Sequence, residues 1–126
     1  MLETKPRPVF LNLMKIRLPI AGIMSIIHRV TGVVMVVSIP FALYLFDRSL
    51  SGTDGFADAR AFLHYGLVKM LLFLFLWGLM HHLLAGIRYL LIDIDIGVDK
   101  PVYRQTAWAV IVGAPVLALI LLGGLS

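Results

Sequence analysis

The stretch "SIIHRVTGVVMVVSIPFALYLF", residues 25–46, is an apolar run with a histidine and an arginine, His28 and Arg29, near its start. It belongs to a segment from about Gly22 to Phe46, which exceeds the roughly 20 residues needed to cross a hydrocarbon core of about 30 Å. Backbone polar groups find no water there, so the segment must be helical. The sequence therefore predicts a transmembrane helix that carries an arginine, which costs roughly 2.5–3.5 kcal/mol at the bilayer centre and less near an end.

The whole chain has the composition of a membrane protein. It is 60% hydrophobic, with a mean hydropathy of +0.97, whereas soluble domains are roughly 45–50% apolar. Two more apolar segments run from about Tyr65 to Leu91 and from about Thr106 to Leu125. Pro40 and Pro115 lie inside spans, where membrane helices tolerate proline. We predict an all-α membrane protein with three transmembrane helices (about 22–46, 65–91 and 106–125) in a single domain, residues 1–126.

Basic residues concentrate in an N-terminal arm, residues 1–20, which also holds three prolines and is predicted to be irregular or interfacial. The positive-inside rule then places the N-terminus in the cytoplasm and the C-terminus outside. The first connection, residues 47–60, is rich in turn-forming residues and lies outside. His64 is expected to be a solvated surface residue beyond it, and the second connection lies inside.

Several kinds of chemistry are excluded for this chain. It has no cysteine, so it holds no disulfide, thiolate zinc site or cysteine-ligated iron–sulfur cluster. There is no GxGxxG motif and no P-loop. Paired intramembrane carboxylates of the kind that move protons in pumps are also missing.

Ser25, His28 and Arg29 share one helix face, because residues three and four apart are neighbours on a helix. One interpretation is that Arg29 reaches to the membrane surface and His28 hydrogen-bonds to a neighbouring helix. The other is a polar pocket for a ligand with oxygens at one end and an apolar body. A quinone or a haem propionate fits that description.

His81 and His82 are adjacent in the second span and must point about 100° apart. His82 has Gly78 and Gly86 one turn away on either side. These glycines either allow close helix packing with a histidine bonding across, or leave room for a haem that His82 ligates. His81 is the second choice of ligand.

Arg88, six residues beyond His82, is most simply interpreted as an arginine that reaches to the membrane surface and anchors the topology. Pairing with a propionate, with Asp93 or with a lipid phosphate are the alternatives.

Three motifs, "RPVFLNL" (residues 7–13), "SIIHRVTG" (25–32) and "HLLAGIRYLLID" (82–93), resemble the cytochrome b membrane-anchor subunit of succinate dehydrogenase, respiratory complex II. The family pattern is Arg-Pro near the start, then Ser-x-x-His-Arg-x-Ser/Thr, then His-x-x-x-Gly-x-Arg followed by an aspartate. The resemblance covers nearly the whole chain. It departs from the pattern at Tyr89, where many members have histidine or phenylalanine, and at the additional His81.

The resemblance implies a subunit that is not catalytic alone. It implies a bundle shared with a sister anchor subunit in the bacterial inner membrane, holding a flavoprotein and an iron–sulfur protein. Electrons from succinate would pass through flavin and iron–sulfur clusters in those partner chains to a quinone. The absence of nucleotide motifs and cysteines agrees with this division of labour.

Carried over residue by residue, the resemblance assigns Ser25 and Arg29 to the quinone site, and His28 with Arg29 to the region of the haem propionates. It assigns His82 as the axial ligand of a haem b whose other ligand is a histidine of the sister subunit. A different class of function stays open from the residues themselves: a non-catalytic three-helix scaffold or transporter accessory subunit, in which Arg29 and His82 serve only helix–helix hydrogen bonds.

Overall fold

The structure is a computed structural model that describes residues 16–124. It contains four helices: α1 (Ile20–Leu50), α2 (Thr53–His64), α3 (Gly66–Asp93) and α4 (Lys100–Gly124). By length and composition, α1, α3 and α4 can each cross a membrane, and α2 is too short to do so. The predicted all-α class with three spans is therefore confirmed.

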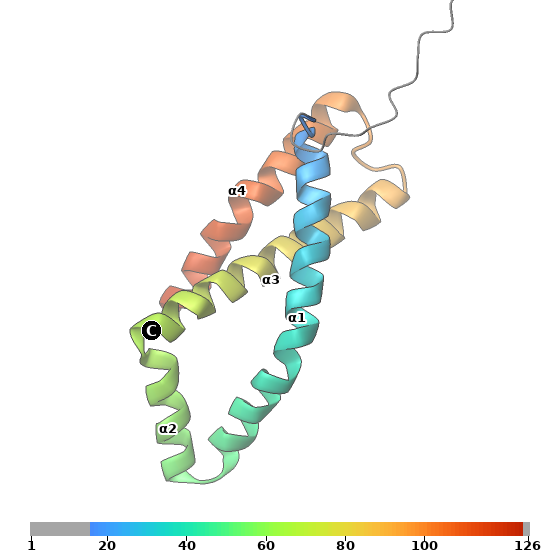
Figure 1. The fold of residues 1–126 in the computed structure, drawn as a ribbon. Helices are drawn as coiled ribbons and strands as arrows, with labels where there is room; N and C mark the ends of the chain where they lie inside the picture. The colour runs from blue at the N-terminus through green and yellow to red at the C-terminus, as the bar shows by residue number, and fades with distance from the viewer. Residues whose placement is uncertain (1–15, 125–126) are drawn as a thin grey trace, which may run out of the picture.

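The central element is α3, which packs against both α1 and α4. Figure 1 shows α1 crossing α3 and then diverging from it, with α2 closing the gap between the two diverging ends. The end of α1 and the start of α3 therefore lie apart, and α2 bridges the distance between them. The other ends of α3 and α4 are joined by the short connection after Asp93.

Small residues make the contact between α3 and α4. Ala85 of α3 and three alanines of α4 (Ala107, Ala114 and Ala118) are completely buried, and Val110 lies among them. Small side chains let two membrane helices approach closely, so that van der Waals contact holds them where no hydrophobic effect acts between helices. Most large apolar side chains of the spans are exposed on this chain, as expected where lipid or another membrane subunit covers them.

The helix boundaries differ modestly from the predicted ones. The first span begins at Ile20, directly after Pro19, and continues beyond Phe46 to Leu50. The third begins at Lys100 rather than about Thr106; its second residue is a proline, which the first turn of a helix tolerates. Of the predicted basic arm, residues 1–15 lie outside the described residues.

The expectation of a turn-rich first connection is wrong over most of its length, because residues 53–64 form α2. The turn is confined to Ser51 and Gly52, where Gly52 has a φ of 108° that favours glycine. Beyond it, alanine, leucine and arginine favour helix. Asp54 in the first turn and His64 in the last complement the helix dipole.

Candidate functional site

His28 and His82 meet where α1 crosses α3. Their rings stack with centroids 4.0 Å apart and planes inclined by 14°. The Nδ1 of His82 lies 3.0 Å from the backbone carbonyl oxygen of His28 and 3.4 Å from the hydroxyl of Thr31. His28 and Thr31 from the motif at 25–32 therefore form one cluster with His82 of α3.

The hydrogen bond to His28 fixes the chemical state of the His82 ring. A carbonyl oxygen only accepts, so Nδ1 carries the proton and donates it. In a neutral ring Nε2 then holds the lone pair. Within residues 16–124 this nitrogen has no hydrogen-bond partner, and it is not one of the enclosed polar atoms without a partner. A histidine with one nitrogen held by a carbonyl and the other free is arranged as a metal ligand.

The neighbouring His81 points elsewhere. Its ring is only 2% exposed, and its Nε2 donates to the backbone carbonyl oxygen of Met24 at 3.3 Å. Because Met24 lies one turn before His28 on α1, the two adjacent histidines contact different turns of that helix. The Nε2 of His81 thus takes part in a hydrogen bond between α3 and α1 and is not free to bind a metal.

Glycines bring α1 and α3 together beside His82. A Cβ placed on Gly32 of α1 would lie 3.0 Å from Cε1 of the His82 ring, one on Gly78 would lie 3.3 Å from Thr31, and one on Gly86 would lie 3.6 Å from His28. The glycine stripe on α3 is therefore filled by α1, as the close-packing interpretation requires. A ligand of His82 would have to approach from the side of Nε2 rather than along the glycine stripe.

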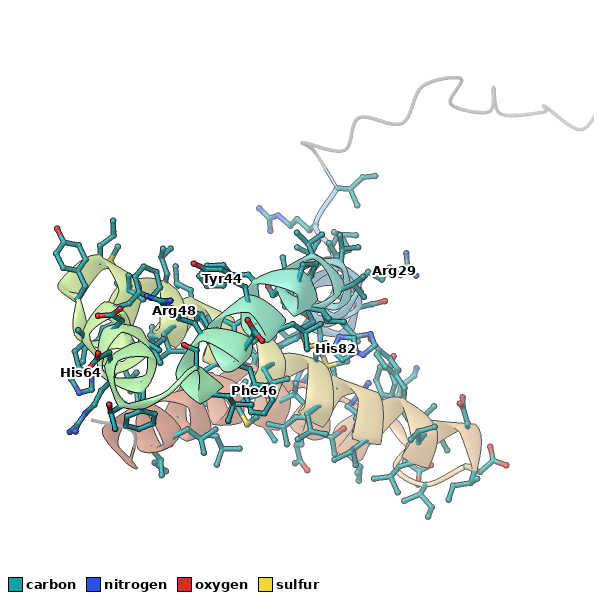
Figure 2. The ribbon with its side chains drawn as sticks, turned by 90° about the horizontal axis from the view of Figure 1, so that it is seen from below. Arg29, Tyr44, Phe46, Arg48, His64 and His82 are labelled. Carbon is teal, nitrogen blue, oxygen red and sulfur yellow. The ribbon has the colours of Figure 1, made fainter. Side chains whose placement is uncertain are left out.

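Ser25 and Arg29 do not close a pocket within this chain. Figure 2 shows Arg29 pointing away from the helices, and its side chain is exposed. Ser25 is half-buried, and its hydroxyl makes no hydrogen bond to any residue of the described range 16–124, whereas Thr31 and Ser38 on the same helix bond to carbonyls one turn back. Both polar groups are therefore available to a group outside the chain.

Arg88 corrects the interpretation as an arginine that reaches the membrane surface. It is 5% exposed and is held by α4: its Nε donates to the hydroxyl of Thr106 at 3.0 Å, and its Nη2 donates to the carbonyl oxygen of Tyr103 at 2.9 Å. The guanidinium carbon also lies 4.3 Å from the centre of the Tyr103 ring, within the range of cation–π attraction. Polar residues at the start of α4 are visible in the sequence, but the sequence does not indicate that they contact Arg88.

His64 is exposed at the end of α2, as predicted, and its Nδ1 contacts the carbonyl oxygen of Arg60 at 2.9 Å. Figure 2 places His64 at one edge of the molecule and His82 nearer its middle. Within residues 16–124, no group of three histidine, cysteine, aspartate or glutamate side chains is placed to hold a metal ion. Any metal at His82 would therefore have to bring its other ligands from elsewhere.

Comparison with known proteins matches residues 3–121 to the family described as the succinate dehydrogenase/fumarate reductase transmembrane subunit. Proteins named succinate dehydrogenase cytochrome b556 subunit are similar over nearly their whole length. The one from Coxiella burnetii is 34% identical over 118 residues, which is 93% of this chain and 94% of the relative. The one from Paracoccus denitrificans is 33% identical over 116 residues, or 92% and 89% of the two chains.

The family match includes the motifs around His28 and His82, all of α1 and α3, and most of α4. The chain therefore belongs to the succinate dehydrogenase/fumarate reductase transmembrane subunit family.

Proposed function

We propose that this chain is a cytochrome b membrane anchor of a succinate:quinone oxidoreductase. It binds haem b together with a sister anchor subunit and forms part of the site where quinone is reduced. Electrons reach that site from succinate through the flavin and iron–sulfur clusters of two further subunits. The observation that carries the proposal is the His82 ring, with Nδ1 held by the His28 carbonyl and Nε2 free.

His82 is the residue that would hold the haem iron. The bond from Nδ1 to a backbone carbonyl orients the ring and raises the basicity of Nε2, as is usual for histidines that bind metals. The His28 ring lies parallel to the His82 ring, 4.0 Å away, and so does not face its Nε2. Within residues 16–124 no other well-placed histidine is available, and the second haem ligand would come from the sister subunit. A bound haem with two histidine ligands supplies one-electron transfer and has no open position for oxygen.

His28 supports His82 in two ways. Its carbonyl accepts the Nδ1 proton, and its ring covers one face of the His82 ring at 4.0 Å. We place His28 and Arg29 near the haem propionates, because cationic and hydrogen-bonding groups stabilise carboxylates in a medium of low dielectric constant.

Ser25 and Arg29 are this chain's contribution to the quinone site. The Ser25 hydroxyl, free of any bond within residues 16–124, can donate to a quinone carbonyl oxygen. The Arg29 guanidinium stabilises negative charge that develops as the quinone is reduced, and this effect is larger where water is excluded. Because Arg29 is exposed on the isolated chain, partner subunits must complete the site and exclude water from it.

The proposed topology places this site at the cytoplasmic face of a bacterial inner membrane. Ser25 and Arg29 lie in the first turns of α1, directly after the basic N-terminal segment. Basic residues next to a span favour the cytoplasmic side. The soluble flavoprotein and iron–sulfur subunits would then dock on the face where electrons leave the clusters for quinone.

The test compares visible spectra of the purified complex carrying His82→Ala, His81→Ala or neither change. The wild-type complex and the His81→Ala complex are expected to show reduced-minus-oxidised bands of a b-type haem, and the His82→Ala complex to lose or shift them. Copurification of the flavoprotein and iron–sulfur subunits with the anchor checks that each complex has assembled, and succinate oxidation by an artificial acceptor checks that the soluble subunits are active.

Bands that survive His82→Ala but disappear with His81→Ala would reassign the ligand. A wild-type complex with neither b-type bands nor succinate–quinone reductase activity would favour the scaffold alternative instead.

A further inference from the structure

A cavity of about 460 Å³ lies at the end of the molecule far from His82, where the end of α1, α2 and the start of α3 meet α4. Its walls are mostly apolar and come from all four helices. The lining includes Phe46 of α1, Phe56 and Leu63 of α2, Leu72 of α3 and Leu122 of α4. Ser25, His28 and Arg29 lie in the first turns of α1 and His82 lies near the middle of α3, and none of these residues lines this cavity.

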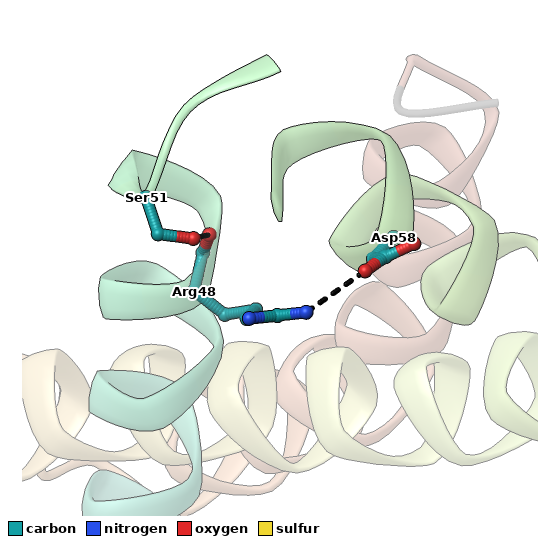
Figure 3. Close-up of polar contacts among 3 residues, drawn as sticks. All are labelled: Arg48, Ser51 and Asp58. Carbon is teal, nitrogen blue, oxygen red and sulfur yellow. Dashed lines mark hydrogen bonds and ion pairs between the residues drawn. The ribbon is translucent and has the colours of Figure 1, made fainter. Parts of the chain in front are cut away.

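Three basic side chains line the same cavity: Arg60 and His64 from α2, and Lys69 from α3. Neither Arg60 nor Lys69 forms an ion pair with another residue in the range 16–124. The nearby Arg48 differs, because it pairs with Asp58 at 3.0 Å and does not line the cavity (Figure 3). The cavity is thus a place where positive charge collects without an acidic partner.

The start of α3 adds to this positive charge. Lys69 lies in the first turn of that helix, which begins without an acidic residue and without a side-chain cap from Tyr65. The first N–H groups of a helix carry a partial positive charge, so a cation beside them is unfavourable unless an anion is also present. An anion at this position would be favoured by the helix end and by the basic side chains together.

A second cavity adjoins the first on the side of the membrane interior. It has a volume of about 560 Å³, lies between α1, α2 and α3, and shares Leu45, Leu63 and Leu72 with the first. It extends as far as Gly78, one turn from His82 on α3, and Thr31, whose hydroxyl lies 3.4 Å from Nδ1 of His82. Its lining is almost entirely apolar. We call these two adjoining cavities the α2 slot, in which the first supplies a basic mouth and the second an apolar interior.

We propose that the α2 slot binds one anionic phospholipid, with its phosphate among Arg60, His64 and Lys69 and an acyl chain between α1 and α3. Charge complementarity selects the anionic headgroup, and the apolar interior selects the chain. A helix of another subunit would satisfy its own backbone hydrogen bonds and could cover the apolar walls, so it is the basic mouth without an acidic partner that favours a lipid phosphate.

The experiment uses the intact complex in phosphatidylcholine nanodiscs that contain a minor fraction of phosphatidylglycerol. Native mass spectrometry counts the lipids that stay bound to the released complex. Wild type should retain phosphatidylglycerol in preference to phosphatidylcholine. Arg60→Gln and Lys69→Gln should each weaken retention about fivefold, the effect expected for one basic residue near a lipid headgroup.

Arg48→Gln is the matched control, since it removes one charge from the same corner but not from the slot, and it should leave retention unchanged. Leu63→Trp keeps every charge and fills the slot at the point where the two cavities join, so it should also reduce retention.

Three results would overturn the proposal. Loss of phosphatidylglycerol from the Arg48→Gln complex equal to that from the slot variants would indicate general surface attraction. Retention of phosphatidylcholine equal to that of phosphatidylglycerol, or full retention of phosphatidylglycerol by the Leu63→Trp complex, would show that the slot does not select this lipid. A correctly assembled complex, judged by the mass of all its subunits in the same native mass spectrum, is required for each variant. None of these readouts depends on the haem or quinone assignments.

Discussion

Two arginines lie inside apolar helices of this protein, and their surroundings differ completely. Arg88 of α3 is 5% exposed and bonds to Thr106 and Tyr103 of α4. Arg29 of α1 is exposed and points away from the other helices (Figure 2). Both lie within two or three turns of a span end, so the hydropathy of the sequence does not distinguish their surroundings. The first is part of the fold, while the second is presented to something outside the chain.

The helix contacts around them differ in the same way. The contact between α3 and α4 is closed by completely buried alanines. The contact between α1 and α3 is made by glycines and stacked histidines, and it opens into a cavity towards α2. We infer that α3 and α4 form the stable base of this subunit, and that α1 supplies the groups that serve other subunits and ligands.

The strongest test of this contrast is Arg29→Ala in the intact complex. We expect quinone reduction by succinate to fall roughly 100-fold, the usual cost of removing one charge-stabilising group from a reaction site. Succinate oxidation by an artificial acceptor should stay at the wild-type rate, because it does not use the quinone site. Steady-state assays with the two acceptors measure the ratio directly. Parallel loss of both activities would mean that Arg29 is needed for assembly, and the contrast with Arg88 would fail.

Arg88→Ala should instead destabilise the subunit. It removes two hydrogen bonds from a charged donor, each contributing about 1.5–3 kcal/mol, while relieving the buried Nη1 that lacks a partner. We expect a net loss of about 2 kcal/mol, seen as a lower midpoint temperature for dissociation of the complex in detergent.

Arg48→Ala is the control for the Arg88 variant, because its ion pair with Asp58 joins two exposed side chains and should contribute between 0 and about 1 kcal/mol. Equal shifts from the two variants would show that Arg88 is no more structural than a surface arginine.

The smallest expected effect tests the contact between α1 and α3. Gly32→Ala places a methyl group 3.0 Å from Cε1 of His82, whose ring is already held by the stack and by Nδ1. We expect a loss of about 1 kcal/mol from overpacking, together with a changed haem spectrum.

Gly123→Ala on α4 meets nothing within 4 Å and should be neutral or slightly stabilising. If Gly32→Ala behaves like this control, the close approach of α1 to His82 does not constrain the ring.

The site residues were predictable to different degrees. Local helical geometry correctly required His81 and His82 to point in different directions, and the structure gives them different carbonyl partners, Met24 and His28. The sequence left open whether the glycines beside His82 serve packing or a cofactor, because that depends on where α1 crosses α3. The helix α2 was not predicted because aspartate and glycine favour turns, although Asp54 and Gly55 lie in its first turn and Asp58 forms an ion pair with Arg48.

The sequence by itself determined that three helices span a membrane and that polar motifs lie near their ends. Both follow from the cost of exposing backbone and charge to hydrocarbon, which depends on composition along the chain and not on neighbouring helices. Only the tertiary structure decided that Arg88 is buried against α4, that His82 keeps Nε2 free, and that Arg29 and Ser25 have no partner within residues 16–124. These outcomes depend on which side chains of separate helices meet, and small residues set those meeting points by allowing backbones to approach.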